Sequence, residues 1–458
     1  MIKAVFKKVV LIFIISFFTP KVNAQCPTNG YVFFSSQAAV NQFIVDYPNC
    51  TQIDGNLLIS AFGTTDITDL SPLENITTVT GNLNINNNTL LTNLDGLSNL
   101  TNVGQALYIN NTALTNLSGL GSLTSIGGNF TITNNPYLTN LDGINSLTNI
   151  GGSFTIQNNP TLTNLDELNA LTTVELNFII KNNASLANID GLSNLNNIMG
   201  NLDIMYNPVL TNLDGLSALT NTGNFLQVGY NPSLTSISGL SSLVNTGGDF
   251  NIIDNDLLTN VDGLISLTNV GGFLAFQSNA SLTNLDGLIN LTAIDGWLDI
   301  HGNSSLTDIL GLQNINSDTI DTELGLSLHI VDNPNLAICN LPNFCSYLAN
   351  PASTHPRTIS GNLADCISSE AVIAACSLGV DDNKLSEIKL YPNPTNAILN
   401  IQNSELITKL IIFDISGKKI KEHNDNVSQI NVENLANGIY ILEIFLGDKK
   451  YIHKFSKH

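Results

Sequence analysis

A heptad of the form Leu-x-x-Leu-x-Gly-Leu recurs eleven times along the chain and constrains the fold more than any other feature. Every interval between copies is 24 residues except one of 23. The fourth residue of each copy is Leu70, Leu94, Leu117, Leu141, Leu165, Ile189, Leu213, Ile237, Val261, Leu285 or Ile309. Such a period is typical of a solenoid, in which each repeat forms one coil that packs against its neighbours.

Each copy also contains a short stretch in which apolar and polar residues alternate, as in Leu83-Asn84-Ile85. Alternation with a period of two predicts a strand. The rest of each copy is rich in Thr, Asn, Gly and Asp, which form helices poorly. The sequence therefore predicts an all-β fold over residues 55–338: a parallel β-solenoid of 24-residue coils, with strands about 4.8 Å apart.

An asparagine recurs five residues after the first apolar residue of the strands. It stands at Asn88, Asn135, Asn159, Asn183, Asn207, Asn231, Asn255, Asn279, Asn303 and Asn333. Amides stacked at one turn can satisfy backbone groups of adjacent coils, so we expect an asparagine ladder. Sequons such as Asn290-Leu291-Thr292 leave glycosylation as an alternative, but the ladder explains the period.

The two ends of the array differ from the repeats. Residues 1–24 carry early lysines, an apolar run and a small-residue end at Ala24, which predicts a signal peptide cleaved before Gln25. Residues 25–54 form a predicted cap with a short helix between Ser35 and Pro48. Residues 339–378 form a second cap, and residues 379–383 a polar linker. Residues 384–458 read as short strands of a small β-sandwich.

The cysteines lie only in the two caps: Cys26 and Cys50 before the array, and Cys339, Cys345, Cys366 and Cys376 after it. An even number in an exported chain predicts disulfides rather than a metal site. Cys26 pairs with Cys50 because no other cysteine lies at that end. Three pairings are open at the other end.

Charge is distributed unevenly. Residues 25–383 hold two basic residues, Lys181 and Arg357, against 29 acidic ones, a net charge of −27. Residues 384–458 hold ten lysines against eight acidic residues. A body this acidic disfavours binding to nucleic acid or to an anionic membrane surface. Beyond the signal peptide, no stretch approaches the length of a membrane span.

The repeats resemble two related families. The core Phe154-Thr155-Ile156-Gln157-Asn158-Asn159 is similar to the Leu-x-Leu-x-x-Asn of leucine-rich repeats, and the whole coil resembles receptor L-domain solenoids more closely. This resemblance covers about residues 50–338. It implies extracellular recognition but transfers no binding residue. Analogy with leucine-rich-repeat caps favours the pairs Cys339–Cys366 and Cys345–Cys376.

The C-terminal segment closely resembles the type IX secretion sorting domain of Bacteroidota. The matching motifs are Tyr391-Pro392-Asn393-Pro394, Ile412-Phe413-Asp414-Ile415-Ser416-Gly417-Lys418, Leu435-Ala436-Asn437-Gly438-Ile439-Tyr440 and Lys454-Phe455-Ser456-Lys457. The resemblance implies that residues 384–458 engage the secretion machinery, and that the body is released or attached outside the outer membrane. A carbohydrate-binding sandwich is the alternative.

The outward positions of the strands are where we expect a ligand. They include Tyr108, Thr131, Thr133, Thr155, Gln157, Ile179, Lys181, Asp203, Met205, Gln227, Asp299, His301 and His329. These residues vary from coil to coil, which favours recognition of a protein or glycan over a structural spacer or surface-layer component. An ice-binding face would need a long Thr-x-Thr ladder, and only Thr131 and Thr133 form such a pair.

Two groups of side chains are candidate ion-binding sites. The turn aspartates Asp142, Asp166, Asp190, Asp214, Asp262 and Asp286 repeat with the period. We expect each to accept backbone N–H groups in an Asx turn, with calcium binding as the alternative. Asp299, His301 and His329 could converge on a metal if the extra six residues of that coil fall around Asp318–Glu323. The alternative is a solvated polar end of the sheet.

The chain offers little for catalysis. A polysaccharide lyase needs a base, commonly Lys or Arg, and the body supplies only Lys181 and Arg357. A glycosidase needs paired carboxylates in a groove, whereas the carboxylates here mostly repeat with the coil. We therefore expect a non-enzymatic binding protein without a cofactor.

Overall fold

The computed structural model describes residues 26–28, 30–60, 66–320, 328–350, 356–378, 390–401, 407–415, 417–424, 427–446 and 449–458. The predicted signal peptide and the 379–383 linker lie outside these residues. The chain divides into two compact units, residues 1–339 with 351–364 and residues 340–350 with 365–458. Each unit is described by itself.

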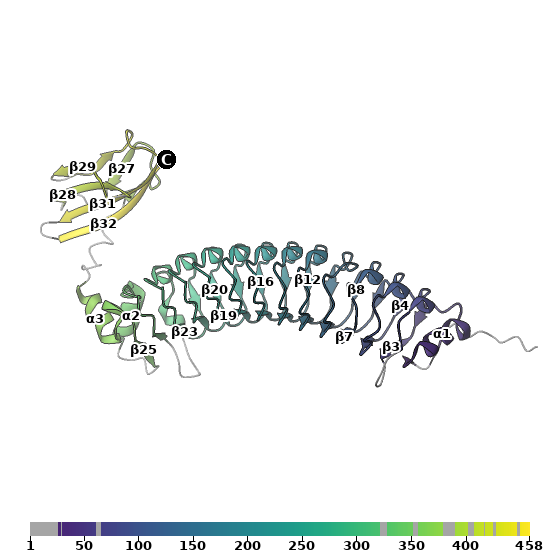
Figure 1. The fold of residues 1–458 in the computed structure, drawn as a ribbon. Coiled ribbons are helices and arrows are strands. Elements are labelled where there is room, and N and C mark those ends of the chain that lie inside the picture. The colour runs from purple at the N-terminus through teal and green to yellow at the C-terminus, as the bar shows by residue number, and fades with distance from the viewer. Residues whose placement is uncertain are drawn as a thin grey trace, which may run out of the picture. The chain divides into compact units, whose positions relative to one another are not determined.

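Parallel strands in chain order form the larger sheet of the first unit, here called the long-strand sheet. Figure 1 shows the coils side by side in an arc. The strands are β1 (Gly30–Phe34), β3 (Gly55–Ser60), β5 (Leu83–Asn86), β7 (Leu107–Asn110), β9 (Phe130–Thr133), β11 (Phe154–Gln157), β13 (Phe178–Lys181), β15 (Leu202–Met205), β17 (Leu226–Gly229), β19 (Phe250–Ile253), β21 (Leu274–Gln277), β23 (Leu298–His301), β24 (Leu328–Val331) and β25 (Arg357–Ser360). The predicted parallel solenoid is confirmed.

A second parallel sheet, which the sequence analysis did not predict, runs along the same coils. Its two-residue strands are β2 (Gln52–Ile53), β4 (Thr78–Val79), β6 (Asn102–Val103), β8 (Ser125–Ile126), β10 (Asn149–Ile150), β12 (Thr173–Val174), β14 (Asn197–Ile198), β16 (Asn221–Thr222), β18 (Asn245–Thr246), β20 (Asn269–Val270) and β22 (Ala293–Ile294). Strands this short carry no alternation for a sequence pattern to reveal.

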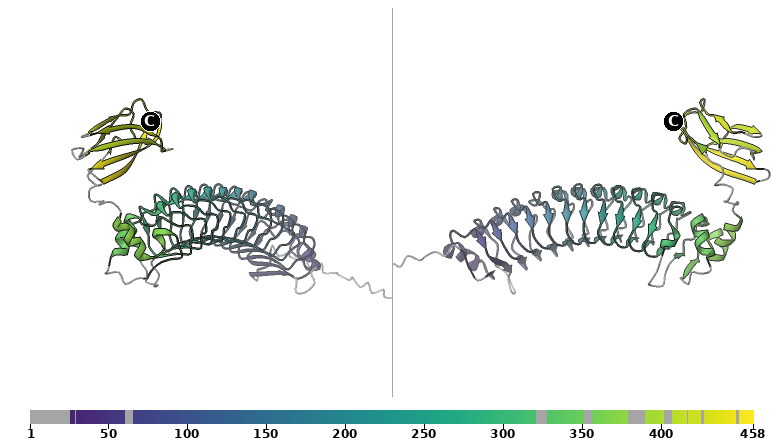
Figure 2. Two further views of the ribbon diagram at one scale, coloured as in Figure 1. Left: turned by 60° about the vertical axis from the view of Figure 1, so that its left-hand side comes forward. Right: turned by 180° about the vertical axis from the view of Figure 1, so that it is seen from behind.

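Every heptad except the one that ends at Ile144 ends in a one-turn 3-10 helix, and these helices follow the outer edge of the arc (Figures 1 and 2). They are η1 (Ser71–Leu73), η2 (Asp95–Leu97), η3 (Ser118–Leu120), η4 (Asp166–Leu168), η5 (Asp190–Leu192), η6 (Asp214–Leu216), η7 (Ser238–Leu240), η8 (Asp262–Leu264), η9 (Asp286–Leu288) and η10 (Leu310–Leu312), with η11 (Ser317–Thr319) and η12 (Ala364–Cys366) beyond. A Cβ on Gly96 would overlap the carbonyl oxygen of Leu70 in the preceding coil. Glycine therefore lets neighbouring turns stack closely.

The predicted asparagine ladder is present and buried. The backbone N–H of Asn159 donates to Asn183 Oδ1 over 3.1 Å, and Asn159 Nδ2 donates to the carbonyl oxygens of Ile132 and Gln157 over 3.0 and 3.1 Å. The same pattern continues to Asn362. In the 23-residue coil Thr112 replaces asparagine, and its Oγ1 donates to Asn135 Oδ1 over 2.7 Å. Each amide thus joins its own coil to both neighbours.

The N-terminal cap contains the predicted helix as α1 (Gln37–Asp46), with Ser36 as its N-cap. Gln37 ties it to the first coil, because its Nε2 donates to Asp69 O over 2.8 Å and its Oε1 accepts from Asp69 N over 2.9 Å. Cys26 and Cys50 form the predicted disulfide. The helix therefore covers the first coil, where an uncovered solenoid would expose its core.

The second unit holds two helices, α2 (Pro342–Ala349) and α3 (Ser369–Leu378), joined by the predicted Cys345–Cys376 disulfide. Cys339 and Cys366 are disulfide-bonded as well, and no cysteine is free. None of the helices in the described residues is long and apolar enough to cross a membrane.

Antiparallel strands follow in two sheets. One contains β26 (Leu390–Tyr391), β27 (Ile398–Ile401) and β30 (Gln429–Asn431), and the other β28 (Lys409–Asp414), β29 (Lys419–Asn424), β31 (Gly438–Leu446) and β32 (Lys449–Lys457). Their buried residues, including Leu399, Leu410 and Phe455, form one apolar cluster. This arrangement confirms the predicted small β-sandwich and shows that its strands pair antiparallel.

Candidate functional site

The second and fourth residues of the four-residue strands point away from the core and form a continuous surface, here called the outer face. The first and third residues, such as Phe154 and Ile156, are fully buried. All the ligand-face candidates from the sequence lie on the outer face, although Met205 is only 6% exposed. The candidate list omitted Asn84, Asn86 and Asn110 in β5 and β7 and Gln277 in β21, although the same alternation places them there.

A column of residues in the left-handed backbone region borders the outer face, just after each strand. Its non-glycine members, all with φ between 50° and 57°, are Asn87, Asn111, Asn134, Asn158, Asn182, Tyr206, Tyr230, Asp254, Ser278 and Asp332. Sequence reasoning missed this column. The sequence does contain a signal for this column, because each member directly precedes a ladder residue.

The N-terminal third of the outer face is hollowed into a shallow open groove of about 420 Å³. Residues of β5, β7 and β9 and the following turn line it: Asn84, Asn86, Tyr108, Asn110, Thr131, Thr133 and Asn134. The lining contains amides, hydroxyls and one aromatic ring, and no charged side chain. The predicted candidates Tyr108, Thr131 and Thr133 therefore meet in one place.

Lys181 contacts several neighbouring side chains in the middle of the outer face. Its Nζ lies 3.9 Å from Asp203 Oδ2, 4.0 Å from Met205 Sδ and 5.4 Å from the centre of the Tyr206 ring. Burial raises the pKa of Asp203, and the nearby ammonium group opposes that shift without cancelling it. Among the described residues, the buried Asp203 Oδ1 has no hydrogen-bond partner. The carboxylate is therefore incompletely compensated.

Tyr206 and Tyr230 extend this cluster along the left-handed column. Their rings stack with centres 4.5 Å apart and planes 8° apart. Partial burial raises the pKa of Tyr230, and the negative charge of Asp254 adds to the shift. These side chains thus form a row along the sheet. Lys181 lies at its positive end, the two tyrosine rings lie in the middle, and Asp254 lies at its negative end.

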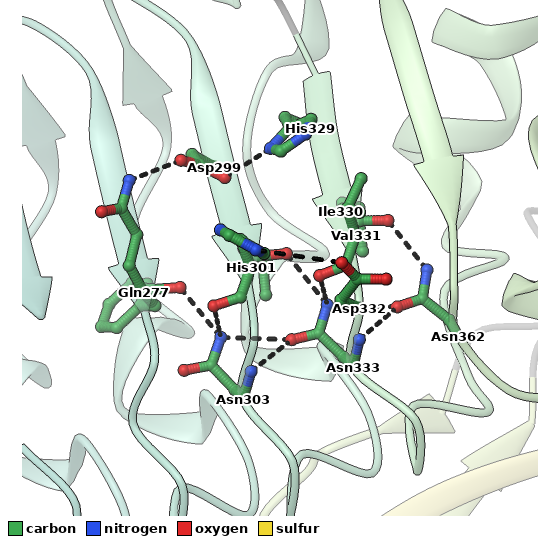
Figure 3. A network of polar contacts seen from close by, with 12 residues as sticks. Gln277, Asp299, His301, Asn303, His329, Ile330, Val331, Asp332, Asn333 and Asn362 are labelled. Atoms are coloured by element: carbon green, nitrogen blue, oxygen red, sulfur yellow. Dashed lines mark hydrogen bonds and ion pairs between the residues drawn. The ribbon is translucent and has the colours of Figure 1, made fainter. Parts of the chain in front are cut away.

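A hydrogen-bonded chain occupies the C-terminal third of the outer face (Figure 3). Gln277 Nε2 donates to Asp299 Oδ2 over 2.6 Å, and His329 Nδ1 lies 2.7 Å from Asp299 Oδ1. Strand register places Asp299 beside His329, as the sequence predicted. His301 instead faces Asp332, with 4.0 Å between Nε2 and Oδ2.

The three metal candidates do not converge. The rings of His301 and His329 have centres 5.8 Å apart, and both oxygens of Asp299 already have partners. In the described part of the chain, no three His, Cys, Asp or Glu side chains are placed to hold a metal ion. The geometry is that of a polar network along the sheet.

The turn aspartates play a different role from the one predicted. The acceptor of each Asx turn is the asparagine two residues earlier: Asn140 Oδ1 accepts from Asp142 N over 3.1 Å, and Asn284 Oδ1 from Asp286 N over 3.1 Å. The prediction that the aspartates accept the backbone N–H groups of these Asx turns was therefore wrong. A neutral amide can repeat in every coil without the repulsion that a column of carboxylates incurs. The carboxylates are left at the surface.

Two family models match parts of this chain. Residues 389–458 match the secretion system C-terminal sorting domain, and residues 49–115 match the receptor L domain. Both resemblances drawn from the sequence motifs are thereby confirmed. The sorting domain identifies the protein as one exported by type IX secretion.

A curated relative is similar over a shorter stretch. Ulvan lyase NLR42 of Nonlabens ulvanivorans is 30% identical over 115 residues, which is 24% of this chain and 20% of that protein. The match thus spans only one fifth of the relative's length.

Proposed function

We propose that the solenoid is a non-enzymatic recognition module that binds a protein or glycan with its outer face. It acts at the cell surface or in the medium after the signal peptide and residues 384–458 have directed export. The matches to a sorting domain and to a receptor L domain support this location and this class of activity.

The observation that carries the proposal is the contrast between the two sides of the long-strand sheet. The inward positions repeat Leu, Ile and Phe with little change, whereas the outward positions change in nearly every coil. A structural spacer would need only the regular apolar residues at the inward positions, which pack the core. Distinct groups held on a rigid sheet, such as the Tyr108 groove and the Lys181 cluster, are what specific binding requires.

A catalytic role is less well supported. The activity in the relative's name belongs to a protein of which this match spans one fifth. The one lysine of the repeat body, Lys181, already contacts Asp203 and the Tyr206 ring, so its Nζ is engaged within the outer face. The outer face offers groups for contact more readily than groups for proton transfer.

The test is a binding screen of the exported protein against polysaccharides and against extracts of neighbouring cells. Thr155→Arg, in the middle of the outer face, should abolish or strongly weaken the interaction. The matched control is Val209→Arg, at an exposed loop position outside the face. Equal binding by both variants would place the ligand elsewhere. Cleavage of any bound polysaccharide by the unmodified protein would overturn the non-enzymatic assignment.

A further inference from the structure

We infer that the groove over β5, β7 and β9 binds a neutral oligosaccharide, laid across the strands. This inference rests on the proposed function and assigns a ligand class to one part of the outer face.

The groove carries polar groups that the protein itself leaves unused. Among the described residues, the side chains of Asn84, Asn86, Tyr108 and Thr131 have no hydrogen-bond partner, although all four line the hollow. Elsewhere in the solenoid, asparagine and threonine side chains mostly bond to the adjacent coil. A cluster of open amides and hydroxyls at a hollow is therefore available to a ligand.

Neighbouring amides are held in fixed orientations. Asn110 Oδ1 accepts from Thr133 Oγ1 over 3.1 Å and from Asn134 Nδ2 over 2.9 Å. Asn134 Oδ1 in turn accepts from Asn158 Nδ2 over 3.0 Å. With its oxygen engaged twice, Asn110 presents its Nδ2 as a donor. Groups oriented before binding lose less entropy when the ligand arrives.

The chemistry of the lining selects the ligand class. Amides and hydroxyls both donate and accept, which matches the hydroxyls of a sugar. The Tyr108 ring offers an apolar surface for the C–H face of a pyranose. A protein ligand would instead favour an apolar centre, whereas six of the seven lining residues are asparagine or threonine.

Charge excludes the acidic glycans. No lining residue is charged, and residues 25–383 carry a net charge of −27. An anionic polysaccharide approaching this body would be repelled, most strongly at low ionic strength. The groove therefore suits an uncharged chain.

The spacing of the sheet suits a polymer. Adjacent strands lie about 4.8 Å apart, which is close to the advance of one sugar unit in an extended chain. Asn84, Tyr108 and Thr131 occupy equivalent positions on three consecutive strands. Consecutive sugars can thus meet consecutive side chains.

The experiment measures binding of the full exported protein to neutral hexasaccharides of β-glucan, xylan and mannan type, with oligogalacturonate as the acidic comparison. Titration calorimetry should detect at least one neutral ligand and no binding of the acidic one. Tyr108→Thr should weaken affinity about tenfold through loss of the ring surface. This variant keeps the fold, because Thr131 and Thr155 occupy the equivalent position in the next coils.

The matched control is Tyr137→Thr, which removes an exposed tyrosine in the loop after the ladder and should leave affinity unchanged. Asn86→Asp, which places a charge in the groove, should weaken binding several-fold. The inference fails if no neutral oligosaccharide binds, if the acidic one binds better, or if Tyr108→Thr has no effect. A ligand lost in Thr155→Arg but insensitive to Tyr108→Thr would overturn this inference while leaving the proposed function standing.

Discussion

At the scale of single residues, two tyrosines occupy backbone positions that favour asparagine. Left-handed φ costs an ordinary L-residue about 1–2 kcal/mol, and asparagine or aspartate offsets part of this through local hydrogen bonds. Tyr206 and Tyr230 have φ of 57° and 55°, where the five preceding column members are asparagines. Ring stacking and the contact with Lys181 hold them there. Strain kept at an exposed surface is typical of functional positions.

The surface aspartates of the 3-10 turns give a prediction at the same scale. Partial burial raises the pKa of Asp286, and the charges of Asp308 and Asp262 add to the shift. Its folded-state pKa lies above the unfolded one, so this group's contribution to stability falls as pH rises through that interval. Asp286→Asn should therefore stabilise the protein at neutral pH and raise its Tm. The gain in unfolding free energy should be less than about 1 kcal/mol.

The gain should shrink in high salt and vanish below the ordinary pKa of aspartate, where both forms are neutral. Thermal unfolding monitored at several pH values measures it. Asp95→Asn is the matched control, because serines, Ser71 and Ser118, begin the turns on either side of Asp95. An equal gain in the control would show that repulsion along the column is not the cause.

At the scale of one element, a single departure from the heptad explains an irregular turn. Glu167 stands where most copies have glycine, and the coil before it lacks the 3-10 helix, with Gly143 at φ of 109°. In the regular coils, a Cβ at this position would overlap the previous coil, as Gly191 shows against Leu165 O. The turn at residues 142–144 has opened to admit the glutamate.

Replacement of this glutamate should restore the regular turn. Glu167→Gly should stabilise the solenoid by about 1 kcal/mol, since relief of overpacking exceeds the added backbone entropy of glycine. Urea unfolding gives the difference. Glu167→Ala removes the carboxylate but keeps the Cβ, so it should recover only the smaller, electrostatic part. If both variants gain equally, close packing is not the reason for the altered turn.

Elements with a strong period were predictable, and those set by a few contacts were not. The 24-residue repeat gave the coils, the ladder and the register that places Asp299 beside His329. The two-residue strands were missed because so short a segment shows no alternation. The direction of His301 toward Asp332 depends on the turn after β24, which no pattern reveals. The groove depends on how the outward side chains of three neighbouring strands leave a hollow between them, which no sequence pattern reveals.

At the scale of the whole molecule, the two compact units carry separate tasks. The first holds the coils and the outer face. The second holds the sandwich that matches the sorting domain. Charge follows the same division, since the acidic residues lie mostly in residues 25–383 and the lysines in residues 384–458. The segment for export and the proposed recognition face can therefore be altered independently.

This division predicts the outcome of a truncation. A chain without residues 384–458 should still fold its coils but accumulate in the periplasm, because the segment read by the secretion machinery is gone. Cell fractionation followed by immunoblotting locates it. The Tyr108→Thr chain, changed only on the outer face, should reach the exterior normally. Delivery of the truncated chain to the cell surface would contradict the assignment of residues 384–458 as the export segment.

The asparagine ladder also constrains how the gene can change. Most ladder residues bond to the equivalent residue 24 positions along, and the same bonds form at spacings of 23 after Thr112 and 30 after Asn303. An insertion or deletion in a loop therefore leaves the ladder intact, whereas one between a strand and its ladder residue would move that residue out of register with both neighbouring coils. Copying or losing the segment that encodes one whole coil preserves every bond. The 23-residue coil fits this rule, because its missing residue falls between Thr112 and Leu114, just past the ladder. Recombination can thus lengthen or shorten the outer face, and with it the ligand the face spans, without redesign of the core.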